Sequence, residues 1–438
     1  MEVPIKALSH SKVIIITFAI AFLVFFARFP QPIITPTIYA EDGVWIGSAL
    51  SNGWLHTFLH ARPDYFVFFN IFSLFLSALL SKVFSGSVLM LLPLFIAIIS
   101  YAFYALTSVV IFFTVRRYAG SMSATLAFIM TSLVPLGVSQ AESIGTLVQI
   151  GFYMPILSIC AHLYRDNLIN RTRRAACDTL IFLMAATNPV NFAVTGTYVI
   201  IKFFGTKDKR KLVIGLSPLL TAMLILFVIV APRMNGSGGI LGSYNASNLV
   251  EMITARSIIF PFIFSFYERL GNLSAVLLTL CFFAFIFFSY IRANNQARVA
   301  ILLLFAMLLI YDAATAAGRS GITGLLNGYT STYPDRYFMG INIISTVLMA
   351  VCIGQVKAKS FRYIIFFALI LVYAGGLKSM FESAPDKRRI PLDYIFTNAL
   401  CSTKEEGNGF SRIQILPTPD WYIRLPSGYV QSIGCVRK

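Results

Sequence analysis

Long apolar runs, separated by short clusters of lysine and arginine, occupy almost the whole of this sequence. Residues 13–29 form the first run, and no small-residue cleavage site follows it, so we expect a retained span instead of a cleaved signal peptide. Hydrophobic residues make up 57% of the chain and charged residues 12%, whereas a soluble domain carries about 25% charged residues. This pattern predicts an all-α polytopic membrane protein.

The formal net charge of +17 comes from basic clusters that lie between the apolar runs. This placement is typical of cytoplasmic loops, which carry an excess of lysine and arginine. Anionic membrane lipids and phosphate-bearing substrates are therefore the partners that we expect for the positive charge. The same placement argues against binding of nucleic acid.

Residues 65–115 can be divided in two ways, and the basic clusters decide between them. Two spans here would place Arg116, Arg117 and the next basic clusters outside, against the positive-inside rule. A single span at 88–115 places every cluster inside, and residues 65–84 then form an apolar helix on the outer surface. We adopt the second interpretation.

Eleven spans follow from this choice, with the amino terminus inside and the carboxyl terminus outside. The short segments around Asn188-Pro189 are either two spans or one broken or re-entrant element, because each is short for a core about 30 Å thick. Besides 13–29 and 88–115, the spans are expected near 121–139, 146–164, 177–188, 191–204, 212–232, 273–291, 299–316, 338–355 and 362–377.

Most of the acidic residues fall on the outer side of this map, so we expect the polar chemistry there. We divide the chain into a transmembrane catalytic domain, 1–377, and a small outer domain, 378–438. The outer segments are 30–87, 233–272, 317–337 and the tail.

The outer tail alternates polar and apolar residues at 411–416 and 421–425, with prolines between the two stretches. This pattern predicts two short strands and a turn. Cys401 and Cys435 both lie in the tail, and an oxidising compartment would favour a disulfide between them.

An acidic pair, Glu41-Asp42, follows the first span in a chain with only 18 acidic residues among 438. A carboxylate at this place can act as a general base on a substrate held at the membrane surface. Both are candidate catalytic residues, and we favour Glu41 as the base. Asp42 is expected to orient its neighbour and to cap a helix that starts at Gly43.

Two outer arginines are candidates for phosphate recognition. Arg336, within Asp335-Arg336-Tyr337, lies where an outer loop enters a span. A guanidinium binds phosphate through two parallel N–H groups, and Tyr337 can stack on a sugar; the alternative is an interfacial anchor. Arg62 shares the outer loop of the acidic pair, and its alternative is snorkelling at the interface.

His56 and His60 are four residues apart and would share one face of a helix. No third ligand accompanies them, so we expect no metal site. The sequence also has no Walker-type loop and no G-x-S-x-G motif, which argues against ATP hydrolysis and serine-hydrolase chemistry. The other outer-face candidates for substrate contact are His60, Arg233, Arg256 and Arg319, with Trp421 and Tyr422 either stacking on carbohydrate or packing the tail.

Three motifs together resemble the GT-C class of integral membrane glycosyltransferases. They are Tyr39-Ala40-Glu41-Asp42-Gly43, Asp335-Arg336-Tyr337-Phe338 and Pro417-x-Pro419-x-Trp421. Among the bacterial members, the chain is most similar to the phage-type O-antigen glucosyltransferases that convert serotype. Family members commonly carry Asp-Glu or Asp-Asp where this chain has Glu41-Asp42, so the resemblance does not decide which carboxylate is the base.

The resemblance implies a sugar donor linked to polyprenyl phosphate, typically undecaprenyl phosphate, and a periplasmic glycan acceptor such as lipopolysaccharide O-antigen. It implies an inner-membrane enzyme without a metal cofactor, working with a donor synthase and a flippase. In such a reaction a base activates an acceptor hydroxyl, and a cation stabilises the departing lipid phosphate.

Two alternatives remain open from the sequence. A transporter or flippase of lipid-linked sugars would share the many spans, but it would place charges at the bilayer midplane and show paired repeats. A lipid-linked glycan polymerase or ligase would share the compartment and the donor. The outer position of the acids favours an enzyme over a transporter.

Overall fold

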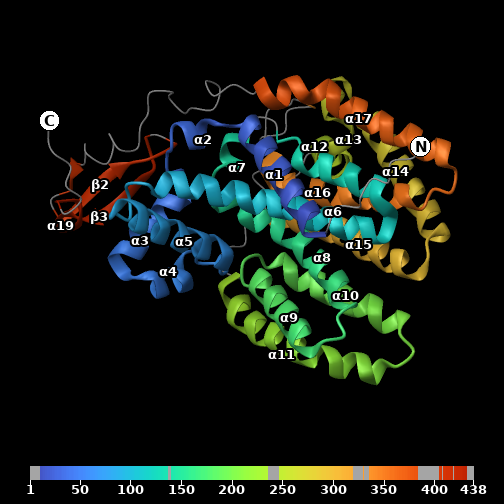
Figure 1. Ribbon diagram of the computed structural model, residues 1–438, viewed down its shortest axis with the longest axis horizontal. Helices are drawn as coiled ribbons and strands as arrows, with labels where there is room; N and C mark the ends of the chain where they lie inside the picture. Colours follow the sequence, from blue (N-terminus) through green and yellow to red (C-terminus); the bar gives the residue numbers. More distant parts are fainter. Residues whose placement is uncertain are drawn as a thin grey trace, which may run out of the picture.

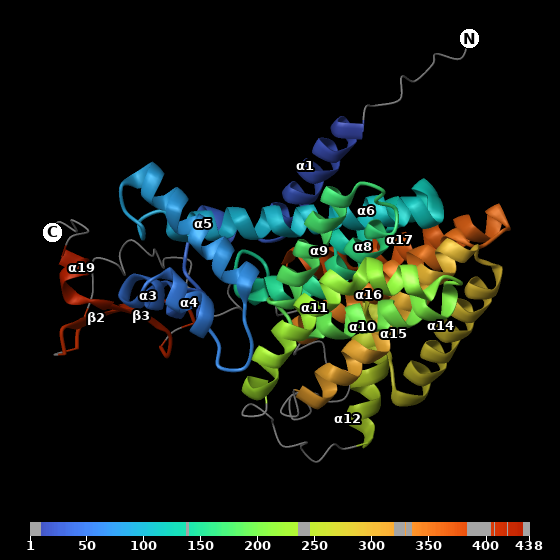
Figure 2. The ribbon, with the colours of Figure 1, turned by 90° about the horizontal axis from the view of Figure 1, so that it is seen from below.

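The computed structural model describes residues 10–136, 140–234, 246–318, 329, 335–382, 404–406, 408–417 and 419–431. Helices form an elongated bundle, and a small sheet lies at one extremity of its long axis (Figures 1 and 2). The elements are α1 (His10–Arg28), α2 (Gln31–Ile34), α3 (Glu41–Asn52), α4 (Trp54–His60), α5 (Phe68–Ser85), α6 (Leu92–Ser132), α7 (Gln140–Ser143), η2 (Val148–Tyr153), α8 (Met154–Arg165), α9 (Arg171–Ala185), α10 (Val190–Gly205), α11 (Lys209–Met234), α12 (Ala246–Val250), η3 (Glu251–Ile258), α13 (Phe260–Ile263), η4 (Phe264–Arg269), α14 (Asn272–Arg292), α15 (Asn295–Gly318), α16 (Asp335–Gly354), α17 (Lys359–Glu382), β1 (Lys404–Glu405), β2 (Phe410–Gln414), β3 (Tyr422–Pro426) and α19 (Ser427–Gln431).

Eight helices in the described part of the chain are long and apolar enough to cross a membrane, or nine if the bent pair Ser247–Ile258 and Phe260–Arg269 is one span. The helical, polytopic class is therefore confirmed. The described helices that are long enough number eight and not the expected eleven, with the two limbs of α6 counted as one element. The predicted span 146–164 begins as the 3-10 helix η2, which leaves α8 with 12 residues, and α9 and α10 have 15 and 16. A straight span needs about 20 residues.

Helix α6 contains two of the predicted spans, 88–115 and 121–139, joined by a reversal at Gly120. Gly120 has φ 84° and ψ 176°, a conformation that glycine adopts without steric cost. Phe112 and Phe128 contact each other at 6.2 Å between ring centroids, so the two limbs run antiparallel. The predicted boundaries are therefore close, although the two limbs form one continuous element.

Polar contacts at one end of the bundle tie α1 to both limbs of α6. The buried Arg28 donates hydrogen bonds to the carbonyl oxygens of Ser132 and Val134 at 2.9 and 2.8 Å. The Tyr101 hydroxyl donates to the carbonyl of Phe29. We call this end, where α1 finishes, the site end.

The opposite end, which we call the basic end, gathers the basic clusters on which the predicted topology depends. Here the Tyr118 hydroxyl donates to the Leu163 carbonyl at 3.2 Å, and Gln355 donates to the Tyr118 carbonyl at 3.0 Å. Segregation of the clusters to one end agrees with the predicted topology. They include Arg116, Arg117, Arg171, Arg173, Arg174, Lys209, Arg210, Lys211, Arg292, Arg298, Lys357, Lys359 and Arg362.

Helix α5 occupies the segment that we expect on the outer surface. Its 18 residues are long and apolar enough to cross a membrane. Its polar contacts nevertheless lie at the site end, where Asn70 donates to the carbonyls of Leu147 and Val148 at 2.7 and 3.0 Å. From Leu92 to Tyr101, α6 extends about 13 Å beyond the level of the α1 terminus. This packing favours a surface position for α5.

The tail forms a three-stranded antiparallel sheet in the order β1-β2-β3. The two predicted strands are confirmed, and the short strand β1 adds to them. Ile413 and Ile423 pack with Ile38 and Ile46 in one buried apolar cluster, so the sheet is supported by the α3 face. The domain boundary at residue 378 stays a prediction, and Cys401 and Cys435 lie outside the described residues.

Two glycines one helical turn apart let the sheet approach α3 closely. A Cβ atom at Gly47 would lie 3.0 Å from the Arg424 carbonyl oxygen, and one at Gly43 would overlap the side chain of Ile415. A larger residue at Gly47 therefore has to displace the backbone of β3, and one at Gly43 has to displace the Ile415 side chain.

Gly47→Leu should loosen the sheet from α3, because overpacking a fitted contact costs about 1–3 kcal/mol. We expect a lower midpoint of thermal unfolding and faster proteolysis of the tail in detergent-solubilised protein. Ser51→Leu, at an exposed position in the last turn of the same helix, is the control. Equal behaviour of the two variants would contradict the packing described for α3.

Candidate active site

A cavity of about 390 Å³ lies at the site end, between α3, the segment that leads into α8, the start of α16 and the tail. It brings together four residues predicted from the sequence, Glu41, Arg62, Arg336 and Tyr337, which are separated by up to 296 positions. Trp421 and Pro417 of the tail also line it. The other polar lining residues are Asn70, Glu142, Gln149, Thr187 and Asn188.

The position of Glu41 depends on an unusual backbone conformation at Ala40, the residue before it. Ala40 has φ 47° and ψ −127°, a region that residues with a Cβ rarely occupy. The Ala40 N–H donates to the Leu416 carbonyl at 2.6 Å, and the Leu416 N–H donates to the Ile38 carbonyl at 3.1 Å. Strain of this kind persists only where the surroundings fix it. The tail therefore sets where the Glu41 side chain meets the cavity.

The prediction that Asp42 caps a helix starting at Gly43 is wrong. The turn fixed by the tail starts α3 at Glu41, so Ala40 is the N-cap and both carboxylates lie in the first turn, where the helix dipole favours negative charge. Asp42 is fully buried, and its Oδ2 accepts the Leu147 N–H at 2.9 Å. Its Oδ1 is buried with no hydrogen-bond partner among the described residues.

The two carboxyl groups of the pair have different environments. Burial raises the pKa of Asp42 from 3.8 to about 8, and the charge of Glu41 adds to the rise, while the N–H groups of Leu147 and Val148 oppose it. Asp42 is therefore largely protonated at pH 7. Glu41 lines the cavity and is the member of the pair placed to accept a proton from a bound substrate.

Asp42 also fixes the segment that carries Glu142. Leu147 donates its N–H to Asp42, while the carbonyl groups of Leu147 and Val148 accept hydrogen bonds from Asn70 of α5. The segment is held from α3 on one side and from α5 on the other. Glu142, five residues before Leu147, is thereby positioned at the edge of the cavity.

Arg336 and Glu142 form an ion pair in the cavity wall, with side chains 24% and 22% exposed. The other terminal nitrogen of Arg336 donates to the Tyr337 hydroxyl at 2.8 Å, and the guanidinium lies 4.8 Å from the centroid of the Tyr337 ring. A guanidinium held in this way has a defined plane. An anion that enters the cavity would compete with Glu142 for the Arg336 guanidinium.

Arg62 reaches the cavity from the loop after α4. Its guanidinium binds both oxygens of Asp64, at 2.9 and 3.1 Å, and lies 4.8 Å from the centroid of the Tyr65 ring. Arg62 and Tyr65 both line the cavity. The bidentate pair orients the guanidinium and also neutralises part of its charge, so Arg62 is a weaker phosphate site than a free arginine.

The remaining predicted site residues do not meet there in the described structure. The ring of His60 stacks on His56 with centroids 4.4 Å apart, and Arg233 donates to the Leu59 carbonyl at 3.1 Å. Asp335 is the first residue of α16. The structure does not describe the Asp335 side chain. The other predicted residues outside the described part of the chain are Arg319, Cys401 and Cys435.

Glu142 and Asn188 line the cavity although neither was predicted as a site residue. Glu142 is the only acid between Asp64 and Asp166, so the scarcity that singled out Glu41 applies to it equally. Asn188 was predicted only as a break between spans. Its side chain donates to the Gly151 carbonyl at 2.9 Å, which fixes the α9–α10 turn against the cavity wall.

Two carboxylates, Glu41 and Glu142, line the cavity, and Arg336 already pairs with the second. Within the described ranges, no group of three or more histidine, cysteine, aspartate or glutamate residues is placed to hold a metal ion. A metal-independent reaction stays a prediction.

No protein-family model and no curated protein sequence matches the chain. Similar solved structures include the Archaeoglobus fulgidus oligosaccharyltransferase in complex with Zn and sulfate, at 15% identity and a TM-score of 0.47, over 88% of this chain and 55% of that one. The oligosaccharyltransferase AglB from the same archaeon, in complex with an inhibitory peptide and a dolichol-phosphate, has 14% identity and a TM-score of 0.47, over 89% of this chain and 58% of that one. This chain spans little more than half the length of either.

The raised pKa of Asp42 predicts a specific pH dependence of stability. Between about pH 4 and pH 8 the native state keeps a proton that the unfolded state releases, so this group lowers the free energy of unfolding by about 1.4 kcal/mol per pH unit as the pH rises. Asp42→Asn removes this term and should raise the thermal midpoint more at pH 8.5 than at pH 5.5.

The comparison needs wild type, Asp42→Asn and the exposed control Asp420→Asn, each unfolded in the same detergent at both pH values. The control should follow the wild type. A parallel decline with pH in wild type and Asp42→Asn would show that Asp42 is ionised and solvated.

Proposed function

We propose that this protein transfers a hexose, most simply glucose, from a polyprenyl-phosphate donor to a glycan acceptor at a membrane surface. The observation that supports this proposal is the convergence of Glu41, Arg62 and Arg336 on one cavity at one end of a membrane-spanning helical bundle. Undecaprenyl-phosphate glucose and lipopolysaccharide O-antigen are the donor and acceptor that we propose. Both follow from the motifs that resemble phage-type glucosyltransferases.

The reaction needs a base near the acceptor and a cation near the leaving group. Glu41 takes the proton from an acceptor hydroxyl while that oxygen attacks the anomeric carbon of the donor sugar. The bond between this carbon and the phosphate oxygen breaks, and the lipid phosphate leaves with the electron pair. The proton on Glu41 then passes to solvent, which restores the base.

Arg336 is the residue that we assign to the leaving phosphate. Its guanidinium is oriented by Glu142 and Tyr337 before a donor binds. Charge on the phosphate grows as the sugar departs, so a cation already in place stabilises the transition state more than the ground state. Arg62 contributes positive charge on another wall of the cavity.

The acceptor glycan is assigned to the tail side of the cavity, formed by Pro417 and Trp421. The Trp421 carbonyl accepts the Ile415 N–H at 3.0 Å and a hydrogen bond from the Gln414 side chain at 2.5 Å. This fixes the backbone that carries the ring. An indole has a large, rigid apolar face, which suits stacking on the carbon–hydrogen face of a sugar.

We place the basic end in the cytoplasm and the site end in the periplasm of a bacterial inner membrane, following the positive-inside rule. The amino terminus is then cytoplasmic and the carboxyl terminus periplasmic. A periplasmic site requires that the lipid-linked sugar be made and flipped first, so a donor synthase and a flippase are the companions that we propose.

A transporter of lipid-linked sugars is the rival function, and the buried charges bear on it. Arg256 and Glu251 lie 3.9 Å apart inside the bundle. Glu251 also accepts the Tyr329 N–H at 3.0 Å, and the Tyr329 hydroxyl donates to Asn272, the first residue of α14 at the site end. The acidic member of the pair is therefore linked to the site end, whereas the Arg256 carbonyl accepts a hydrogen bond from Asn342, seven residues into α16. The contact of Glu251 with the site end favours the enzyme.

Glu41→Gln should lower the rate of sugar transfer by at least about 100-fold, the low end of what a general base contributes. The change keeps the size of the side chain, so abundance and thermal midpoint should stay near wild type. The assay follows radiolabelled hexose from polyprenyl-phosphate hexose into acceptor glycan in proteoliposomes. Glu268→Gln, an exposed acid outside the cavity, should keep full activity, and similar rates in both variants would remove Glu41 from the mechanism.

Arg336→Lys should lose much of the turnover, because an ammonium group does not reproduce the two-point contact of a guanidinium. Arg336→Ala should lose nearly all of it. The measurement is turnover at saturating donor together with donor affinity, with the exposed Arg269→Ala as control. Wild-type turnover and donor affinity in Arg336→Ala would reduce this residue to an interfacial anchor.

A further inference from the structure

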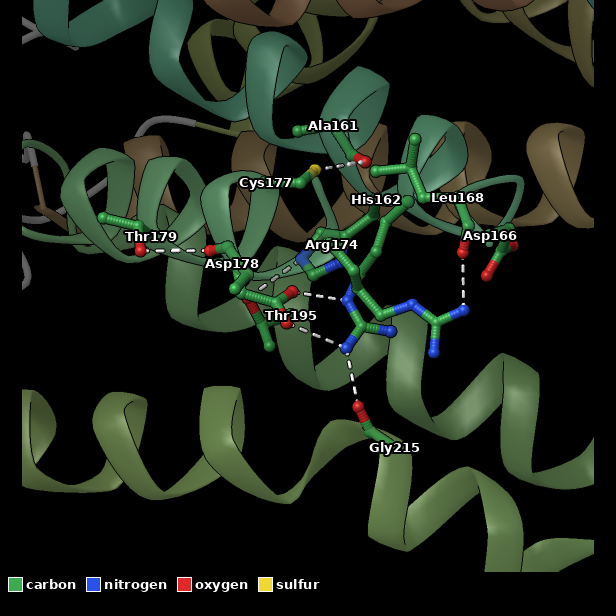
Figure 3. A network of polar contacts seen from close by, with 12 residues as sticks. Ala161, His162, Asp166, Leu168, Arg174, Cys177, Asp178, Thr179, Thr195 and Gly215 are labelled. Carbon is green, nitrogen blue, oxygen red and sulfur yellow. Dashed lines mark hydrogen bonds and ion pairs between the residues drawn. The ribbon is translucent and has the colours of Figure 1, made fainter. Parts of the chain in front are cut away.

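The acidic side chains on one flank of the basic end are all paired. Asp178 binds Arg165, whose guanidinium also donates to the Gly215 carbonyl at 2.7 Å. Figure 3 shows Asp178 of α9 and Gly215 of α11 within this network of polar contacts. In the same region Lys202 lies 2.7 Å from Asp166. Asp208 pairs with Lys211 at 3.0 Å. These contacts join α8, α9, α10 and α11, and they consume the negative charge at this end.

The opposite flank of the basic end has no such compensation. It consists of the end of α14, the turn into α15 and the turn between α16 and α17. The sequence contains no acid between Glu268 and Asp312, and none between Asp335 and Glu382. This flank therefore carries five basic residues and no acidic one: Arg292, Arg298, Lys357, Lys359 and Arg362.

Two of these five cations form hydrogen bonds with backbone carbonyl groups, and three do not. Arg298 donates to the Ile291 carbonyl at 2.8 Å, and Arg362 donates to the Val356 carbonyl at 3.2 Å. Arg292, Lys357 and Lys359 are exposed and have no hydrogen-bond or ion-pair partner in the part of the chain that the structure describes. Three free cations of this flank therefore lie close to the turn between α16 and α17 and the end of α14.

A second cavity, of about 250 Å³, opens at this turn. Phe285 and Phe288 of α14, Phe361 of α17 and Val356 form its apolar walls, and Arg292, Ser289 and Gln355 its polar part. Phe288 and Phe361 are 57% and 51% exposed, so the cavity faces the perimeter of the bundle. A ligand that fits this slot needs an apolar part to contact the aromatic walls and an anionic group to bind the unpaired arginine.

We propose that this cavity is a binding site for an anionic phospholipid. One acyl chain occupies the slot between Phe285, Phe288 and Phe361, and the phosphate lies by Arg292 at the first turn of α17. The N–H groups of a helix amino terminus favour an anion, and Lys357 and Lys359 add attraction to the lipid surface. A zwitterionic lipid can fill the apolar slot, but it has no net charge for the free cations to attract. This site is independent of the proposed transfer reaction and lies at the other end of the molecule.

The test uses full-length protein in a neutral detergent with three probes: dioleoyl-phosphatidylglycerol, dioleoyl-phosphatidylcholine and glycerol phosphate. Retention of each lipid is measured by native mass spectrometry, and thermal protection is measured in parallel. We expect wild type to bind the phosphatidylglycerol about fivefold more tightly than the phosphatidylcholine, the effect of about one cation near a membrane surface.

Arg292→Gln should remove most of this preference, whereas Arg210→Gln should leave it unchanged. Both residues are exposed at the basic end, but Arg210 lies at the start of α11, away from the cavity. Phe361→Ala should weaken retention of both lipids and keep the preference between them.

Three results would overturn the proposal. Equal binding of the two lipids by wild type would remove the headgroup requirement. Protection by glycerol phosphate equal to that by phosphatidylglycerol would indicate a surface anion site without an acyl chain. An equal loss in Arg292→Gln and Arg210→Gln would indicate diffuse attraction to the whole basic end.

Discussion

The hydrogen bond between the buried Asp42 carboxyl and the Leu147 N–H is the contact on which the rest of the site depends. It joins the first turn of α3, where Glu41 lies, to the segment that carries Glu142. Glu142 in turn holds Arg336 of α16. Three parts of the chain more than 90 residues apart are thus placed around one cavity through a single buried acid. Burying an ionised carboxylate beside a second one would cost free energy. The raised pKa of Asp42 favours its neutral form, which avoids this cost.

The tail completes this arrangement from the opposite side. Leu416 pairs with Tyr39, next to the strained Ala40, so the end of the chain fixes the start of α3. Trp421 then forms part of the cavity wall. The membrane domain and the outer tail are separate in the sequence, but residues from both line the cavity.

The sequence was a good guide wherever one physical rule dominated. Hydropathy predicted the helical class, and the positive-inside rule grouped Arg116, Arg174 and Arg292 at one end. Alternation of polar and apolar residues predicted β2 and β3. The scarcity of acids identified Glu41, and the position of Arg336 at a loop-to-span junction placed it at the same end of the bundle.

The rest depended on contacts between distant segments, which local patterns do not contain. The number of helices long enough to span differs from eleven for two reasons. The 3-10 helix η2 and the Asn188-Pro189 break shorten the elements beside them, and the two limbs of α6 form one continuous element. The cap role of Asp42 was wrong because Leu416, 374 positions away, fixes the turn at Ala40. Glu142 was missed because its importance lies in its pairing with Arg336.

We propose that the Glu41 cavity adds a sugar to a glycan outside the cytoplasm. The most direct measurement is the composition and linkage analysis of cell-envelope glycans from host cells with the gene intact, with the gene deleted, and with the gene carrying Glu41→Gln. One hexose substituent should be present in the first strain and missing from both of the others. Identical envelope glycans in all three strains would contradict the proposal.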